Sequence, residues 1–565
     1  MGCFYDKSGG ESIAGKERCR VSGDGCRYFF DRHLTPDTCH PSIYDSRFTI
    51  YDSGMNLVEF VFQAARRMNR WPEVAILCEG RALSYEQLLR QIRKYVGMIE
   101  ALGVGPGERV AICAADCPEW IISFLGTTGA GAVAVPMSTM LSAAELQYVL
   151  NHCGAKALVV TSEQVEKLLG IGGHLPQLEH VLLIDGEADG TLSFNPMLAD
   201  AREAEIKPVD DDALAFILYT SGSTGPPKGA MHLHRNLPFT VQTCCRHILE
   251  VSPQDRLFSS SRLFFAYGLG NSLSFPLSSG ATTVLCKEKP TPHTIARLFT
   301  AHRPTIFFSV PSVFRALIEY AAREGALETD SIKFCVSAGE KLPDTVFHEW
   351  KELTGLDILD GIGSTEMLQM FISNSREQPR PGSSGRLVPG YEAKLIDQQG
   401  QEIEGAGTGH LMIKGGSASP GYWNDPAKTA ATMQGEWVRT GDLYRRDEDG
   451  YFWFEGRSDD LFKVKGLWVS PVEVEEALLS CAGVVEAAVV AGVNRDGMNR
   501  VVAYVVLRPG QRSEEEAAAA LKSEVSRLLP SYKCPAEIYF VDQLPRTATG
   551  KLQRFRLREQ RVSPE

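Results

Sequence analysis

The residues with the clearest chemical potential form a loop that is rich in glycine and hydroxyl groups. Residues 218–229 read LYTSGSTGPPKG, an apolar start followed by four hydroxyl side chains, two glycines and then a lysine. Glycines let backbone amides approach an anion closely, hydroxyls add donors, and the lysine supplies a compensating charge. The segment therefore predicts a phosphate-binding loop made by Thr220, Ser221, Gly222, Ser223, Thr224, Gly225 and Lys228.

Two other interpretations of this loop agree less well with its residues. A flexible linker of similar composition seldom follows an apolar, strand-like stretch or ends in Pro-Pro-Lys. The Walker A loop of ordinary kinases and GTPases needs a glycine, four residues, and then Gly-Lys-Ser/Thr. Counting from Gly222, Pro227 precedes Lys228 and Gly229 follows it, so the loop does not match that motif.

A carboxylate follows a second glycine-rich segment later in the chain. Residues 360–366 read DGIGSTE, and Glu366 offers the hard oxygen ligand that Mg²⁺ prefers beside a phosphate. Thr365 can donate a hydrogen bond to the α-phosphate. Taken alone, such a glutamate would more often be the solvated start of a helix. Together with the phosphate loop, Glu366 predicts a magnesium–nucleotide site.

The order of the motifs along the chain resembles the adenylate-forming superfamily of acyl-CoA synthetases, peptide-synthetase adenylation domains and luciferases. After residues 360–366 come RTGDL at 439–443, GRSDD at 456–460 and PRTATGK at 545–551. The resemblance extends roughly from residue 55 to 558. Within the superfamily, FFAYGLGN at 264–271 is most similar to the benzoate and 4-hydroxybenzoate CoA ligases.

This resemblance implies a role in nucleotide binding for several residues that alone would fit ordinary turns. Asp442 would accept hydrogen bonds from the ribose hydroxyls, with Arg457 beside it, because an ionised carboxylate only accepts. Gly339 and Glu340 would lie on the adenine side. The other residues assigned to nucleotide or coenzyme are Asp360 and Gly466.

Lys551, in the last motif, is predicted to promote adenylation, the first half-reaction, in which a carboxylate and ATP form an acyl-adenylate. A carboxylate that attacks an α-phosphorus brings two anions together, and a cation between the attacking and bridging oxygens stabilises that transition state. Without the resemblance, Lys551 would read as a solvated lysine in a basic tail. The resemblance implies that a small domain rotates about Asp459 after adenylation. This rotation withdraws Lys551 and places residues 465–468 at the tunnel through which the acceptor thiol enters.

The resemblance also indicates an aromatic acid as substrate. Tyr267 offers an aromatic wall, and Gly361 with Gly363 leaves room for the edge of a flat ring. Gln369 stands where such ligases usually have histidine, so a neutral amide replaces a potential cation and the identity of the acid stays open. Packing of an aromatic run in the core is the competing interpretation. The predicted acid contacts are Ala266, Tyr267, Gly268, Gly361, Gly363 and Gln369.

Several domains must position these groups, because 565 residues exceed the roughly 250 to 300 that one core usually reaches. Short β-branched strands alternate with helices from about residue 157 to 359, which predicts α/β layers around largely parallel sheets. Strands with glycine turns follow from Pro389 and indicate a β-rich subdomain. We therefore expect an N-terminal extension without regular structure at 1–54, a large domain at 55–457 and a small, mobile α+β domain at 458–565.

The expected extension contains cysteines and histidines, which are zinc ligands. No pair of them has the Cys-x(2–4)-Cys spacing of common structural sites, so a metal is the less favoured interpretation. The residues concerned are Cys3, Cys19, Cys26, His33, Cys39 and His40.

Composition and charge exclude several functional classes. A net charge of -12 provides no cationic field for nucleic acid or acidic membranes. No window reaches the roughly 18 to 20 continuous apolar residues that a membrane-spanning helix needs. The start of the chain resembles no signal peptide, and the cysteines are scattered as reduced thiols are. These features favour a soluble, cytoplasmic protein.

The predicted reaction is that of an AMP-forming acid–thiol ligase with ATP, Mg²⁺ and coenzyme A. ATP and an aromatic acid give an acyl-adenylate and pyrophosphate, and the CoA thiol then displaces AMP. One alternative is delivery of the acyl group to the phosphopantetheine arm of a carrier protein, although the sequence has no appended carrier domain. A silent nucleotide-binding protein is a second alternative, against which Lys551, Glu366 and Thr365 speak. The oligomeric state stays open, a homodimer included.

Overall fold

The computed structural model divides the chain into two units, Met1–Asp52 and Ser53–Glu565, and the described residues all belong to the second. The described ranges are 55–171, 175–220, 226–494, 497–508, 514–546 and 552–559. The predicted extension with its cysteine and histidine cluster lies outside these ranges, as do residues 221–225 and Lys551. Within the described ranges, no helix is long and apolar enough to cross a bilayer.

The ordered part begins with two short helices, α1 (Leu57–Val61) and α2 (Gln63–Arg67). Apolar residues follow helical spacing from residue 57, which predicts one helix, but the helix is interrupted at Phe62, whose ring packs against Trp71 and Tyr85. The N-cap Asn56 side chain accepts a hydrogen bond from Val58 N and donates to distant carbonyls of Thr128 and Lys207.

A seven-stranded sheet in the described residues has the order β7-β6-β5-β3-β4-β8-β9. Its strands are parallel up to β8, and β9 joins antiparallel. The strands are β3 (Arg109–Cys113), β4 (Val133–Pro136), β5 (Ala155–Val160), β6 (His180–Leu183), β7 (Leu192–Ser193), β8 (Leu214–Thr220) and β9 (Lys228–Leu233). The helices of this region are α3 (Tyr85–Ala101), α4 (Pro118–Gly129), α5 (Ala143–Cys153), η3 (Ser162–Gln164), α6 (Val165–Ile171) and α7 (Phe194–Asp200). α3 begins with a capping box, in which Ser84 and Gln87 bond reciprocally, as a serine followed three residues later by glutamine predicts.

A nine-stranded sheet follows, with the order β16-β15-β14-β13-β12-β10-β11-β1-β2. Its six central strands, β14 to β1 in that order, are parallel, and its edge strands are antiparallel. The strands are β1 (Val74–Cys78), β2 (Arg81–Ser84), β10 (Arg256–Ser259), β11 (Thr282–Leu285), β12 (Ile306–Ser309), β13 (Phe334–Ala338), β14 (Ile358–Gly363), β15 (Met370–Ser373) and β16 (Arg386–Leu387).

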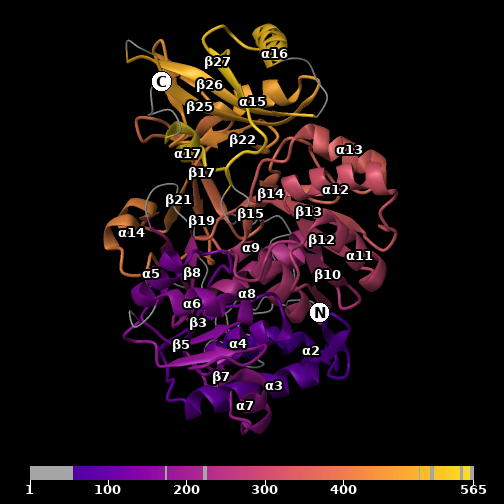
Figure 1. The fold of residues 1–565 in the computed structure, drawn as a ribbon, viewed down its shortest axis with the longest axis vertical. Coiled ribbons are helices and arrows are strands. Elements are labelled where there is room, and N and C mark those ends of the chain that lie inside the picture. Colours follow the sequence, from indigo (N-terminus) through magenta and orange to yellow (C-terminus); the bar gives the residue numbers. More distant parts are fainter. Residues whose placement is uncertain are drawn as a thin grey trace, which may run out of the picture. The chain divides into compact units, whose positions relative to one another are not determined.

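Helices cover this second sheet, and aromatic side chains of the sheet and the helices pack together in the core. Figure 1 shows α12 and α13 side by side next to β12 and β13. Phe307 on the sheet packs edge-on against Phe314 of α12, which packs in the same way against Trp350 of α13. The helices are α8 (Asn236–Thr240), η4 (Val241–Leu249), α9 (Ala266–Leu269), η5 (Gly270–Ser274), α10 (Phe275–Ser279), α11 (Pro292–His302), α12 (Pro311–Glu324) and α13 (Asp344–Thr354).

The predicted β-rich subdomain is an antiparallel sheet, with β22 paired to β21. Its elements are β17 (Glu392–Ile396), β18 (Glu402–Ile403), β19 (Gly407–Lys414), α14 (Pro426–Thr432), β20 (Met433–Gln434), β21 (Trp437–Arg446) and β22 (Phe452–Arg457). The change of pattern near Pro389 therefore marks a real change of architecture.

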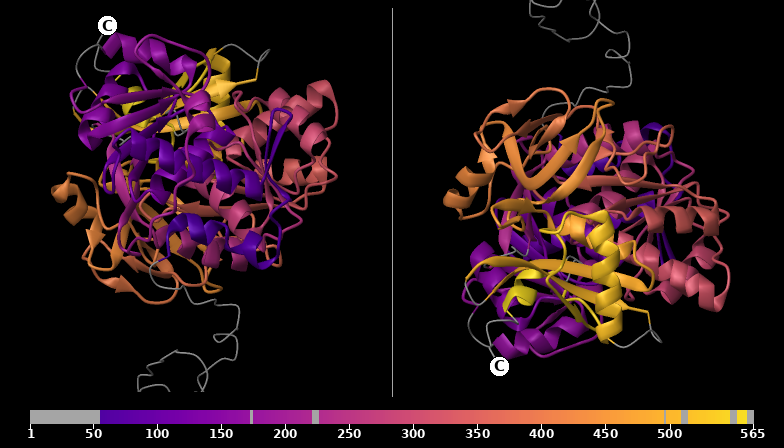
Figure 2. Two further views of the ribbon diagram at one scale, coloured as in Figure 1. Left: turned by 90° about the horizontal axis from the view of Figure 1, so that it is seen from below. Right: turned by 90° about the horizontal axis from the view of Figure 1, so that it is seen from above.

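The C-terminal part is a smaller α+β unit. A hairpin of β23 (Phe462–Val464) and β24 (Leu467–Val469) precedes a sheet in the order β25-β26-β27. Val474 of α15 and Leu521 of α16 are buried with Val489 and Val501 of the sheet, and Figure 2 shows α16 against these strands. The elements are α15 (Pro471–Leu479), β25 (Val484–Val493), β26 (Asn499–Leu507), α16 (Glu514–Leu528), β27 (Glu537–Phe540) and α17 (Arg554–Glu559). The predicted α/β fold class is confirmed.

Candidate active site

The predicted phosphate loop connects two neighbouring strands of the first sheet. β8 ends at Thr220, β9 begins at Lys228, and these two residues pair across the antiparallel ladder. A side chain at Gly229 would come within 2.7 Å of Ile217 Cγ2, so only glycine lets the strands lie this close at the loop exit. The loop therefore follows the carboxyl end of a parallel strand, where α/β sheets bind ligands. Its residues Ser221, Gly222, Ser223, Thr224 and Gly225 lie outside the described ranges.

β9 also holds the turn that carries Thr365 and Glu366. The ring Nε2 of the buried His232 on β9 lies 2.9 Å from the Thr365 carbonyl oxygen. Burial lowers the pKa of His232 to about 4, so the neutral ring donates through Nε2–H at physiological pH. This hydrogen bond joins the two sheets and brings Thr365 next to the strand that leaves the phosphate loop.

The Glu366 carboxylate is fixed by a tyrosine from the β-rich subdomain. The Tyr422 hydroxyl donates to Glu366 Oε1 over 2.6 Å, and the Glu366 carbonyl accepts from Ser419 N over 2.7 Å. Tyr422 in turn forms an antiparallel bridge with Ala230 of β9. Three separate parts of the chain therefore meet at this carboxylate.

Lys228 lies near Glu366 and near a second lysine, Lys428. Burial and then the neighbouring Lys428 ammonium lower the pKa of Lys228, whereas the charges of Glu366 and Asp425 act in the opposite direction. Lys428 lies in the first turn of α14, where its backbone N–H donates to the N-cap Asp425 over 2.9 Å. Two neighbouring cations, one of them near a carboxylate, are an arrangement that suits the phosphates of a nucleotide with a divalent ion.

The structure places Asp442 and Arg457 together on neighbouring strands. They pair across β21 and β22, and Arg457 Nη1 donates to Asp442 Oδ1 over 2.9 Å. The charge of Asp442 is the largest cause of the raised pKa of Arg457. A side chain at Gly441 would lie 3.0 Å from the guanidinium, so glycine with its φ of 79° leaves room for this pair.

The predicted adenine-side residues lie near Asp360, toward the carboxyl ends of two neighbouring parallel strands of the second sheet. Ser337 pairs with Asp360 and Ala338 with Gly361 on the parallel strands β13 and β14, so Gly339 and Glu340 emerge beside Asp360. The buried Asp360 has one oxygen, Oδ1, without a hydrogen-bond partner among the described residues. Burial raises the pKa of Asp360 to about 8.

This pKa predicts a pH-dependent stability that Asp360→Asn should remove. Between about pH 4 and pH 8 the folded chain keeps the proton that the unfolded chain has lost, so stability falls as pH rises through this window. Asparagine does not titrate, so the variant lacks this pH dependence of stability. The melting temperature of Asp360→Asn relative to wild type is expected to increase by about 2 °C from pH 6 to pH 8. Calorimetry at both values measures it, and a constant difference would contradict the assignment.

Arg546, in the last motif, contacts Glu340 next to the carboxyl end of β13. Arg546 Nη1 lies 3.1 Å from Glu340 Oε1, and its Nη2 lies 2.9 Å from Glu486 Oε2. Arg546 also forms a β-bridge with Leu552. Glu340 therefore contacts the C-terminal part of the chain. Lys551, which precedes Leu552 in the sequence, lies outside the described ranges.

The predicted hinge and coenzyme residues lie in exposed turns. Asp459 is exposed and lies two residues after the end of β22, between Ser458 and Asp460. Gly466 has a φ of 82° in the turn of the β23–β24 hairpin. The next residues, Leu467 and Trp468, are 51% and 46% exposed, which is unusual for large apolar side chains.

The predicted acid contacts gather around α9. Tyr267 donates its hydroxyl to the Val336 carbonyl over 3.2 Å, and its ring packs edge-on against Phe308. Ala266 begins the helix and is half-buried. A side chain at Gly268 would come within 2.0 Å of the Arg262 carbonyl oxygen, so backbone packing alone requires this glycine.

Gln369 lies against the same segment. Its side chain is 2% exposed, its Oε1 accepts from Met370 N over 3.0 Å, and its Nε2 lies 3.4 Å from Asn271 Oδ1. A side chain at Gly270 would meet Gln369 Nε2 at 2.1 Å. The amide is thus held by protein groups on several sides.

Gly361 and Gly363 both lie close against neighbouring residues, and their contact with the acid stays a prediction. A side chain at Gly361 would lie 2.7 Å from Met370 Sδ, and one at Gly363 would lie 2.7 Å from the Gln369 backbone. The room that the sequence suggested for a ring is filled by β15 on the side where a side chain would project. Close antiparallel pairing explains both glycines.

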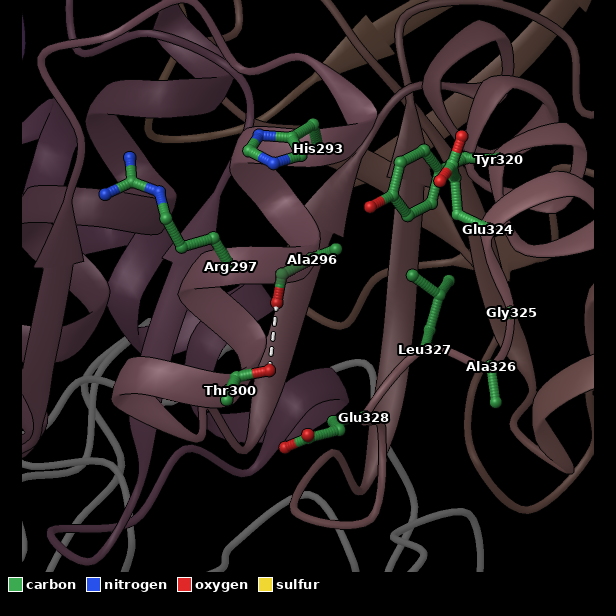
Figure 3. A pocket seen from close by; sticks show the side chains of 10 residues that line it. All are labelled: His293, Ala296, Arg297, Thr300, Tyr320, Glu324, Gly325, Ala326, Leu327 and Glu328. Carbon is green, nitrogen blue, oxygen red and sulfur yellow. Dashed lines mark hydrogen bonds between the residues drawn. The ribbon is translucent and has the colours of Figure 1, made fainter.

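A surface pocket of about 260 Å³ lies away from these groups. Figure 3 shows His293 and Arg297 of α11 on one side and Tyr320 and Glu324 of α12 on the other. Its lining contains none of the predicted site residues.

Sequence reasoning missed several residues of the site, namely His232, Asn271, Tyr422 and Lys428. Asn271 stands inside the aromatic segment 264–271, and its Nδ2 is buried without a partner among the described residues. The others carry no local signal, because their significance comes from contacts with Thr365, Glu366 and Lys228.

Comparison with known families agrees with this geometry. The chain matches the AMP-binding enzyme family over residues 62–423 and the AMP-binding enzyme C-terminal domain over residues 473–551. The first match covers more than half of the chain. The protein therefore belongs to the AMP-binding enzyme family, which confirms the resemblance to adenylate-forming enzymes.

The individual relatives with high similarity are ligases that act on benzoates within this family. The benzoate–CoA ligase of Thauera aromatica is 42% identical over 85% of this chain and 91% of its own length. The 4-hydroxybenzoate–CoA/benzoate–CoA ligase of Rhodopseudomonas palustris is 37% identical over 87% of this chain and 91% of its own. The crystal structure of a benzoate CoA ligase from Burkholderia xenovorans superimposes with a TM-score of 0.82 at 37% identity, covering 89% of this chain and 100% of that one.

Proposed function

We propose that this protein is an AMP-forming acid–thiol ligase that converts an aromatic carboxylate of the benzoate class to its CoA thioester. The observation that carries the proposal is the junction at β9. This strand leaves the phosphate loop at Lys228, holds the Thr365 turn through His232, and borders Tyr422 with its hydrogen bond to Glu366. The names of the relatives supply the acid class and the thiol.

The first half-reaction joins the acid to the α-phosphate of ATP. The phosphate loop and Lys228 would hold the phosphates, and Asp442 would accept hydrogen bonds from the ribose. The half-buried Glu366 carboxylate fits Mg²⁺, since it is a hard oxygen donor beside the loop exit. When bound, Mg²⁺ supplies charge neutralisation on the phosphate oxygens. Lys551 stabilises the attacking and bridging oxygens as pyrophosphate leaves.

The second half-reaction transfers the acyl group to the thiol of CoA, with AMP as leaving group. The small domain, residues 458–565, would rotate relative to residues 55–457 about Asp459, withdrawing Lys551 and presenting Gly466. Exposed Leu467 and Trp468 support a role for this hairpin, because large apolar side chains in solvent often mark contact surfaces.

An acid-panel assay tests the proposal. The protein is incubated with ATP, Mg²⁺ and substituted benzoates, and pyrophosphate exchange and CoA consumption are followed separately. Both signals are expected with at least one benzoate. Exchange without CoA consumption would favour a carrier-protein acceptor, and no exchange with any acid would favour a silent nucleotide-binding protein.

Gln369→His is expected to change the order of preference among the benzoates without stopping adenylation. The substitution replaces a neutral amide beside α9 with a ring that can carry charge. We expect a change of about tenfold in relative kcat/KM between acids, the effect of roughly 1.4 kcal/mol. Kinetics on the same panel measure it, and an unchanged ranking would remove Gln369 from the acid site.

We further propose a cytoplasmic location and small-molecule partners without nucleic acid. The ten described cysteines are free thiols, which suits a reducing compartment, and the net charge of -12 opposes binding to nucleic acid. Light scattering tests whether the protein forms a homodimer.

A further inference from the structure

The hydrogen bond between Tyr422 and Glu366 joins residues that are 56 positions apart in the sequence. Tyr422 is 6% exposed, and its hydroxyl lies 2.6 Å from Glu366 Oε1, a short distance for a hydroxyl donor to a carboxylate. A phenol is protonated at neutral pH, so the Tyr422 hydroxyl donates this hydrogen bond to the carboxylate.

The backbone around Tyr422 is tied to β9 on both sides. Met231 N donates to the Gly421 carbonyl over 3.0 Å, and Trp423 N donates to the Gly229 carbonyl over 2.8 Å. These bonds extend the edge of the first sheet by a short segment, residues 421–423. The segment therefore has the same fixed relation to the phosphate-loop exit as β9 itself.

Tyr422 is also tied to the helix that carries Lys428. Its backbone N–H donates to Thr429 Oγ1 over 2.9 Å, and Thr429 Oγ1 donates to the Asp425 carbonyl over 2.8 Å. A side chain at Gly421 would come within 2.7 Å of Thr429 Cγ2, so this close approach needs glycine. This segment thus ties Tyr422, whose hydroxyl donates to Glu366, to the first turn of the helix that carries Lys428.

We propose that Tyr422 is the positioning residue of the magnesium site, holding Glu366 Oε1 so that the carboxylate would be oriented to bind the ion. The inference rests on the proposed function, in which Glu366 binds the Mg²⁺ of MgATP. A free glutamate side chain loses rotamer entropy when it binds an ion, and the tyrosine hydrogen bond restricts the side chain before the ion binds. Outer partners of metal ligands typically change metal affinity by about 10- to 100-fold.

The test is Tyr422→Phe, which removes only the hydroxyl. Mn²⁺ replaces Mg²⁺ as the probe, and its affinity for the protein with a non-hydrolysable ATP analogue is measured by electron paramagnetic resonance. We expect Mn²⁺ binding to weaken about tenfold. The Mg²⁺ concentration for half-maximal adenylation should rise by the same factor, with kcat at saturating Mg²⁺ within about threefold of wild type. A purely structural role would instead lower activity at every Mg²⁺ concentration.

Tyr391→Phe is the matched control. The Tyr391 hydroxyl lies 2.9 Å from Ser417 Oγ, and both residues are buried in the same subdomain. This variant loses a comparable hydrogen bond and should bind Mn²⁺ as wild type does.

Glu366→Gln separates failure of this inference from failure of the proposed function. Weak Mn²⁺ binding by Glu366→Gln together with wild-type binding by Tyr422→Phe would overturn the positioning role and leave the ligase assignment intact. Wild-type Mn²⁺ binding by Glu366→Gln would overturn both the metal role of Glu366 and this inference. In the Glu366→Gln background, Tyr422→Phe should have no further effect on Mn²⁺ affinity, because the tyrosine acts through the carboxylate.

Discussion

Lys551→Ala is expected to abolish adenylation while leaving thioester formation from a supplied acyl-adenylate intact. Only the first half-reaction brings a carboxylate onto a phosphate, so only that step needs a cation between two repelling groups. Loss of one such preorganised group commonly costs about 10² to 10³ in rate. Pyrophosphate exchange measures the first step, and CoA consumption with synthetic benzoyl-adenylate measures the second.

Arg556→Ala is the control for this experiment. Arg556 is an exposed cation on α17, five positions from Lys551, and its removal tests whether any loss of positive charge in this segment is sufficient. Both half-reactions should persist in this variant. Equal loss of both half-reactions in Lys551→Ala would contradict a role that is limited to adenylation.

Asp442→Ala is expected to raise KM for ATP about 10- to 100-fold. Hydrogen bonds to charged groups contribute roughly 1.5 to 3 kcal/mol each, and the ribose would lose its acceptor. The substitution also leaves Arg457 without the carboxylate that lies 2.9 Å away. Steady-state kinetics with ATP as the varied substrate measure the effect, with KM for the acid followed in parallel.

Glu455→Ala provides a comparison on the same two strands. Arg445 of β21 and Glu455 of β22 form a cross-strand ion pair of 3.2 Å that is partly exposed to solvent. Exposed ion pairs contribute little to folding stability, so the two strands should keep their arrangement in this variant. KM for ATP should therefore stay at the wild-type value. A normal KM for ATP in Asp442→Ala would remove Asp442 from the nucleotide site.

The contacts between the C-terminal part and the second sheet are compatible with the proposed rotation. Arg546 pairs with Glu340, and Lys341 pairs with Glu476, at side chains that all keep some solvent exposure. Ion pairs of this kind contribute about 0 to 1 kcal/mol each. Breaking them would therefore oppose domain movement only weakly.

Local patterns in the sequence were sufficient for much of the secondary structure. The sequence alone predicts a strand at Phe462–Val464 and a helix at Pro471–Leu479, which are the bounds of β23 and α15, and it predicts the capping box of Ser84 and Gln87. These features depend on side-chain periodicity and on hydrogen bonds within three or four residues. The interruption at Phe62 was not predicted, since it accompanies packing against Trp71 and Tyr85, which no short window contains.

The sequence by itself determined the α/β class, the order of the motifs and, through that order, the family. Only the tertiary structure decided that β9 joins the Thr365 turn through His232, that Tyr422 holds Glu366, and that β15 fills the space beside Gly361. Motifs are contiguous, so the chain alone displays them. The contacts of His232 with Thr365 and of Tyr422 with Glu366 join residues that are 133 and 56 positions apart, and their partners follow from strand order and register.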